Sequence, residues 1–140
     1  MIRRDFLLQQ IEEMGRVLGQ ILLNMMGLKN NALVSRHVIE EARQTLQDEA
    51  DLNIDQLLEV PTDKFIQALQ KNKAMNDANL DRFAAILFHI AENTEDKDKA
   101  TCLYERSLII YNYLDQSGEI YSFDRSYFLE QIRKALKTSS

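Results

Sequence analysis

The side chains best suited to metal chemistry are two histidines, each of which precedes a glutamate by three residues: His37 with Glu40, and His89 with Glu92. On a helix, residues three apart lie on one face, so each pair could direct two ligands at one point. Di-iron helical bundles use the opposite order, glutamate before histidine, and need further inward glutamates. We therefore expect no metal site, and we interpret each pair as a solvated His–Glu neighbour pair.

The only cysteine, Cys102, could act as a nucleophile if a basic group such as His89 activated its thiol. No catalytic signature surrounds Cys102, and we expect its side chain to be partly buried and to serve packing. The chain also contains no phosphate-binding glycine loop, serine elbow or metalloprotease helix. The sequence therefore predicts no catalytic residue and no cofactor.

The aromatic residues are unevenly distributed, because all five tyrosines lie between Tyr104 and Tyr127. A tyrosine ring buries apolar area and keeps a hydroxyl for hydrogen bonding, which suits a groove that holds a peptide or a helix. Tyr113 and Tyr121 fall outside the expected core face and are the better candidates for an exposed partner-binding surface. Tyr104 and Tyr111 are further candidates, although they lie on the expected core face and ordinary core packing is the favoured interpretation for both.

The first helix has apolar residues at alternating spacings of four and three, which is the pattern of a packed helical seam. Gly15 and Gly19 within it would let another backbone come close. We favour burial of this helix against its own domain, with a homodimer seam as the alternative. We do not expect membrane contact, because the five basic and three acidic residues among residues 1–36 give a net charge of only +2, which is small for binding anionic lipid. The candidate residues of the dimer seam are Leu7, Ile11, Met14, Leu18, Ile21 and Met25.

The elements that must position these residues are all predicted to be helices. Only four glycines and one proline interrupt 140 residues, and helix-forming residues dominate long stretches. Asn53 and Gln56 have the spacing of a helix cap, and residues 80–91 are apolar almost all round, as in a central buried helix. The expected helices cover residues 4–26, 32–49, 54–60, 63–71, 80–91, 99–114 and 123–137. We expect one all-α domain over residues 1–140 with five to seven helices, residues 1–28 forming the amphipathic N-terminal one.

Composition and charge narrow the function classes. The 17 basic and 22 acidic residues give a net charge of −5, the wrong sign for a surface that neutralises nucleic acid. A single cysteine cannot form a disulfide within the chain and favours a reducing compartment. Neither an export signal nor a stretch of roughly 20 apolar residues is found, so we expect a cytoplasmic location.

Ala100, Tyr104 and Ser107 stand where the second helix of a tetratricopeptide repeat has a small residue, an aromatic and a second small residue, so this stretch resembles that helix. Leu87 matches the repeat's leucine, whereas Phe88 replaces its glycine. The whole chain resembles a family of small, uncharacterised, all-helical bacterial proteins with tetratricopeptide-like architecture. The segments on which this resemblance rests are residues 4–7, 15–18, 54–58, 113–115 and 122–125.

This resemblance implies a tetratricopeptide-like helical array over residues 76–137, with the long N-terminal helix packed across it. It implies no established activity, because a fold alone does not specify function. We expect a non-enzymatic protein–protein interaction module whose partner is a protein or peptide segment, with the acidic surface selecting basic partners. The alternatives are a small-ligand-binding protein or enzyme with a pocket among the C-terminal helices, and a purely structural homodimer.

Overall fold

The computed structural model describes residues 2–26, 32–116 and 123–139, and this part of the chain is helical without any strand. The all-α prediction is confirmed. The elements are α1 (Ile2–Met26), α2 (Ala32–Ala50), α3 (Ile54–Glu59), the 3-10 helix η1 (Thr62–Lys64), α4 (Phe65–Gln70), α5 (Asp77–Glu92), α6 (Lys97–Gln116) and α7 (Phe123–Ser139). One hydrophobic core contains residues from all seven of these α-helices.

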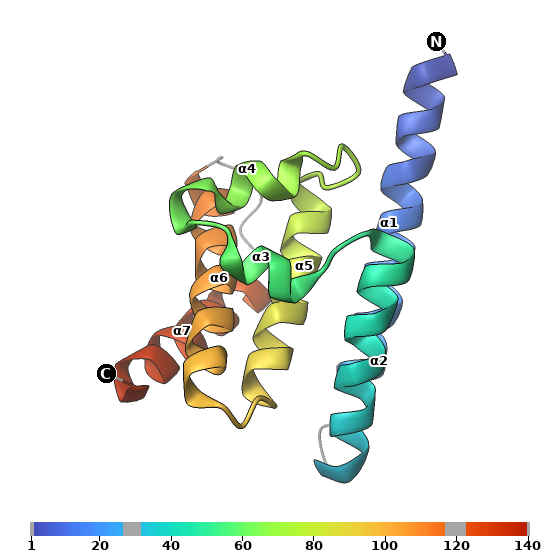
Figure 1. Ribbon diagram of the computed structural model, residues 1–140. Coiled ribbons are helices and arrows are strands. Elements are labelled where there is room, and N and C mark those ends of the chain that lie inside the picture. Colours follow the sequence, from blue (N-terminus) through green and yellow to red (C-terminus); the bar gives the residue numbers. More distant parts are fainter. Residues whose placement is uncertain (1, 27–31, 117–122, 140) are drawn as a thin grey trace.

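The two long N-terminal helices, α1 and α2, run in opposite directions side by side, and α1 also packs against α5 (Figure 1). The N-terminal end of α1 projects beyond the other helices (Figure 1). In the described residues, no helix has the length and apolar character needed to cross a bilayer.

The six candidates for a dimer seam lie on the face of α1 that packs against other helices of the same chain. Met14, Leu18, Ile21 and Met25 are buried, whereas Leu7 and Ile11 near the projecting end are half-buried. The a/d spacing of this helix therefore serves packing against α1's own neighbours in the same chain.

Helix α5 occupies the centre of the fold, as the apolar run predicts, with 11 of its 16 residues buried. It begins at Asp77, earlier than expected, because the Asn76 side chain accepts a hydrogen bond from the Asn79 N–H at 3.0 Å and caps the helix. Helix α6 lies alongside it (Figure 1). The Ser107 hydroxyl donates to the Ala84 carbonyl at 2.8 Å, so the small residue allows the two helices to approach closely.

The segment between α2 and α5 forms two short helices and a 3-10 turn. Asn53 caps α3 by accepting from the Gln56 N–H, as its spacing predicts. The single helix expected over residues 63–71 is instead divided into η1 and α4. Arg106 of α6 holds this segment: its Nη2 donates to the Leu58 carbonyl at 3.0 Å, and its guanidinium lies 5.1 Å from the centre of the Phe65 ring.

The two glycines of α1 have different surroundings. A Cβ atom at Gly15 would lie 3.2 Å from Asn79 Oδ1 and 3.3 Å from Arg82 Nη1, so this glycine allows α5 to approach. A Cβ atom at Gly19 would have no neighbour within 4 Å. Only Gly15 therefore has a packing reason within the described chain.

This difference predicts unequal effects of a glycine-to-alanine substitution on stability at the two positions. Alanine is preferred to glycine in a helix by about 1 kcal/mol, so Gly19→Ala should raise the free energy of unfolding by about 0.5–1 kcal/mol. Gly15→Ala should gain less, because Asn79 and Arg82 must shift to admit the methyl group. Urea denaturation of both variants provides the measurement, and an equal gain at the two positions would show that Gly15 is not needed for the approach of α5.

Candidate functional site

The first histidine pair is solvated, but its partner differs from the expected one. His37 Nε2 lies 3.2 Å from Glu41 Oε1, one residue beyond Glu40, and both side chains are exposed. A spacing of four residues also brings side chains together on a helix, and here it is the one used.

The second pair is not solvated, which corrects the sequence interpretation. His89 is 5% exposed; its Nδ1 lies 3.3 Å from Glu92 Oε1, and its ring lies edge-on to Phe128 of α7, with ring centres 5.6 Å apart. His89 Nε2 is buried without a hydrogen-bond partner. Packing of α7 over this side of α5 buries the ring, a tertiary effect that the local sequence does not reveal. The described residues contain no group of three or more His, Cys, Asp or Glu that could hold a metal ion.

Cys102 is exposed, contrary to the prediction that it is partly buried. Its helix, α6, buries other positions, among them Leu103, Arg106 and Ile110. Cys102 lies immediately before the first of these and outside the buried set. The exposed Cys102 thiol and the buried His89 ring are in different environments, so the structure gives no support to catalysis by this pair.

The tyrosines take several roles. Tyr111 is fully buried, in agreement with core packing, and Tyr121 lies outside the described residues. Tyr113 is half-buried, and its hydroxyl accepts a hydrogen bond from Gln70 Nε2 of α4 at 2.8 Å. Tyr104 is half-buried against Phe88, and desolvation, followed by the negative charge of Glu92, raises the pKa of its phenol. These three described candidates therefore hold the helices together more than they form a free surface.

A groove that the tyrosine pattern does not indicate lies between α1, α5 and α7. It has a volume of about 320 Å³ and is lined by apolar side chains from all three helices, with Asp81 and Arg82 as the polar members. We call it the α1–α5–α7 groove. Its apolar lining consists of Leu22, Met26, Ala78, Ala85 and Phe128.

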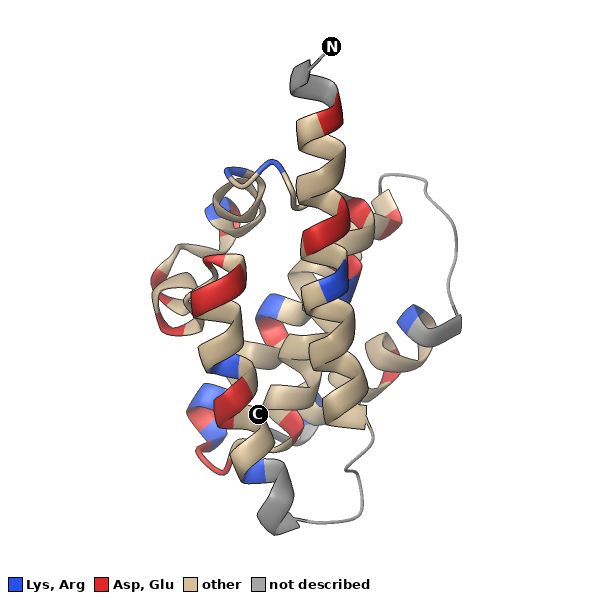
Figure 2. Cartoon of the chain, turned by 90° about the vertical axis from the view of Figure 1, so that its right-hand side faces the viewer, with Lys and Arg blue, Asp and Glu red and all other residues tan. Residues whose placement is uncertain are grey.

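The surface beside this groove is unusually apolar on the side of α1. Met26 is 50% exposed although it is a large hydrophobic residue. Residues 17–26 of α1 contain no charged side chain, so the lower half of this helix is tan in Figure 2. The small side chains of Ala78 and Ala85 on α5 leave room for an occupant between the helices.

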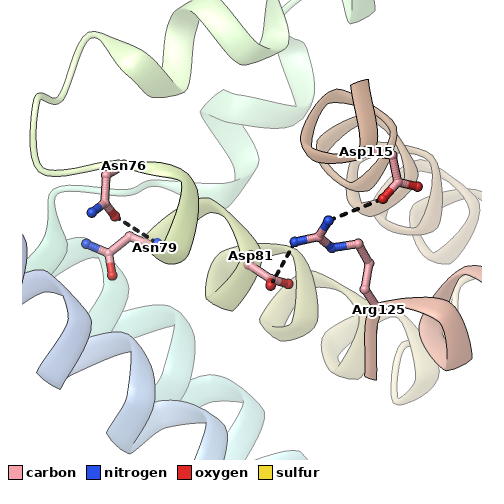
Figure 3. A network of polar contacts seen from close by, with 5 residues as sticks. All are labelled: Asn76, Asn79, Asp81, Asp115 and Arg125. Carbon is pink, nitrogen blue, oxygen red and sulfur yellow. Dashed lines mark hydrogen bonds and ion pairs between the residues drawn. The ribbon is translucent and has the colours of Figure 1, made fainter. Parts of the chain in front are cut away.

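The wall of the groove formed by α5 is joined to α6 and α7 through Arg125, as Figure 3 shows. Arg125 is 6% exposed; its Nη1 lies 3.2 Å from Asp115 Oδ1 and its Nη2 lies 3.3 Å from Asp81 Oδ2. Burial acts to lower the pKa of Arg125, but the hydrogen bonds and charges of Asp115 and Asp81 outweigh it and raise the pKa. The carboxylate of Asp81 is therefore neutralised within the chain.

The same wall is joined to α1 through Asn79, which is fully buried. Asn79 Nδ2 donates to the Ala74 carbonyl at 2.8 Å and to the Ile11 carbonyl of α1 at 3.1 Å. Its Oδ1 accepts from Arg82 Nη1 at 2.8 Å. Its backbone N–H donates a hydrogen bond to Asn76 Oδ1 (Figure 3). Asn79 therefore fixes the position of Arg82 relative to α1.

Sequence reasoning did not find the groove, because its residues come from helices that are far apart in the chain. One local signal was available: Ala78, Arg82 and Ala85 lie at spacings of four and three on α5 and so share one face. Comparison of the chain with protein-family models, with curated proteins and with solved structures gave no match.

Removal of the Arg125 guanidinium should loosen the junction of α5, α6 and α7. Loss of one partner from a fully buried ion pair costs about 3–5 kcal/mol, but Asp81 and Asp115 are partly exposed and can regain water, so Arg125→Met should cost about 2 kcal/mol. Arg133→Met, at an exposed position of the same helix, is the matched control and should change stability by less than about 0.5 kcal/mol. Urea denaturation measures both, and similar losses would contradict a structural role of Arg125.

Proposed function

We propose that this protein is a helical protein–protein interaction module that binds an amphipathic helix of a partner protein in the α1–α5–α7 groove. The observation that carries the proposal is the groove itself, which is open to solvent and is lined by apolar side chains from three helices, among them the half-exposed Met26. Apolar grooves between helices accept the apolar face of another helix by the same packing that joins helices within a domain.

The dimensions suit a helix. Ala78 and Ala85 are seven residues apart on α5, which corresponds to about 10 Å or two helical turns. Two or three apolar side chains of an incoming helix, spaced three or four residues apart, can occupy that length. The Met26 side chain, at the end of α1, is half-exposed, so an occupant larger than a small molecule would bury more of this apolar lining.

Polar contacts between the helices also fix the walls of the groove. Asn79 joins α5 to α1, and Arg125 joins α5 to α6 and α7. A binding surface whose walls are fixed before the partner arrives loses little conformational entropy on binding.

The proposal includes a tetratricopeptide-like arrangement of α5, α6 and α7 and a cytoplasmic location. The close approach of α6 to α5 at Ser107 and Ala84 supports the first, since small residues at such positions are what the repeat requires. The single cysteine of the chain supports the second.

A display library of amphipathic helical peptides of about 16 residues can test the binding function. Peptides enriched on the wild-type protein should bind the Met26→Asp variant at least about tenfold more weakly, because a charge at the edge of the groove must lose water on binding. They should bind the Leu8→Asp variant with unchanged affinity. Leu8 is the matched control, since it is 51% exposed on the same helix but does not line the groove.

Circular dichroism and urea denaturation verify that both variants fold. Two outcomes would contradict the proposed function: failure of the wild-type protein to enrich any peptide over the bare support, and equal effects of the two substitutions on the enriched peptides.

A further inference from the structure

The two charged residues of the α1–α5–α7 groove are not equivalent. The Asp81 carboxylate is paired with Arg125, which lies 3.3 Å away and is itself shared with Asp115. Arg82 is exposed and donates one hydrogen bond, to the neutral side-chain oxygen of Asn79. Among the residues that the structure describes, no carboxylate forms an ion pair with Arg82. The groove therefore presents a positive charge that no carboxylate of the described residues neutralises.

This positive charge is held in place. Asn79, which receives the Arg82 hydrogen bond, is fixed by its own bonds to the carbonyls of Ile11 and Ala74. The guanidinium lies against Gly15 of α1, where a Cβ atom would approach within 3.3 Å of Nη1 and 3.7 Å of Cζ. A guanidinium has five N–H donors, and the bond to Asn79 uses one of them. The remaining donors are available to a ligand at a fixed position beside the apolar lining.

We infer that the partner helix carries an aspartate or glutamate within its apolar face, and that this carboxylate pairs with Arg82. The inference rests on the proposed function and specifies the partner class. Arg82 lies four residues after Ala78 and three before Ala85, so the acidic residue is flanked on both sides by apolar residues three or four positions away. Arginine suits this role because its planar guanidinium can bind both oxygens of a carboxylate.

The positive charge of Arg82 thus favours an acidic partner, whereas the negative net charge of the chain favours a basic one. A net charge of −5 favours basic partners in long-range encounter. At physiological salt, charges more than about 8 Å away are largely screened, whereas a pair inside an apolar groove is screened much less. The contact at Arg82 therefore decides which helix remains bound.

The test repeats the peptide selection on three proteins: wild type, Arg82→Glu and Arg133→Glu. Arg133 is exposed on α7 and does not line the groove, so its substitution changes the net charge equally and serves as the matched control. Peptides selected on wild type and on Arg133→Glu should carry Asp or Glu between apolar residues. Peptides selected on Arg82→Glu should carry Lys or Arg at that position.

A double-mutant cycle on one wild-type-selected peptide gives the magnitude. Replacement of its acidic residue by the corresponding amide should weaken binding to wild type about tenfold, a typical value for a charge-assisted pair. The same replacement should change binding to Arg82→Gln by less than about twofold, because the partner charge is already absent. The glutamine amide is neutral but still a hydrogen-bond donor, so this variant removes the charge and leaves a polar side chain at the position. Urea denaturation verifies its folding.

The outcomes separate the two proposals. Peptides that lose binding on Met26→Asp but show no acidic preference would overturn the pairing with Arg82 and leave the groove as the binding site. Peptides that are insensitive to Met26→Asp, or the absence of any enriched peptide, would overturn the proposed function and the inference together.

Discussion

The arrangement of the other helices depends on the burial of α5. Its side chains are apolar on nearly all sides, so the helix is stable only when neighbours cover it from several directions. α1, α6 and α7 provide that cover. Burial also has a polar consequence, because the polar groups taken out of water must find partners. Asn79 satisfies this demand at the junction with α1, and Arg125 with Asp81 and Asp115 does so at the junction with α6 and α7. The groove lies at the place where these two junctions leave α5 uncovered.

Most of the helical elements can be predicted from the sequence because their causes are local. The spacing of apolar residues in α1 and the cap formed by Asn53 depend on residues within a few positions of one another. The early start of α5 is also encoded locally, in the cap residue Asn76, although the strongly apolar run that predicts the helix begins only at Leu80. The left-handed conformation of Asp51, with φ of 54°, which follows the end of α2, has no glycine to signal it.

The candidate site could not be predicted, because its properties arise from contacts between distant segments. The burial of His89 depends on Phe128, which is 39 positions further along the chain. The neutralisation of Asp81 depends on Arg125, and the free charge of Arg82 depends on the absence of such a partner among the described residues. The tyrosine-rich part of the chain suggested an exposed partner-binding surface at Tyr113, but the Tyr113 hydroxyl joins α6 to α4 through Gln70, and Tyr111 lies in the core. A net charge describes the whole surface, whereas recognition in a groove depends on the few charges that are not already paired.

The most direct measurement of the central claim is a methyl NMR titration of the protein with a helical peptide selected on it. Binding in the α1–α5–α7 groove predicts that the largest shift changes occur at the methyl groups of Met26, Ala78 and Ala85, which line the groove. The methyl group of Ala68, on α4 and outside the groove lining, should change little. Largest changes at Ala68, with Met26, Ala78 and Ala85 unaffected, would contradict the account.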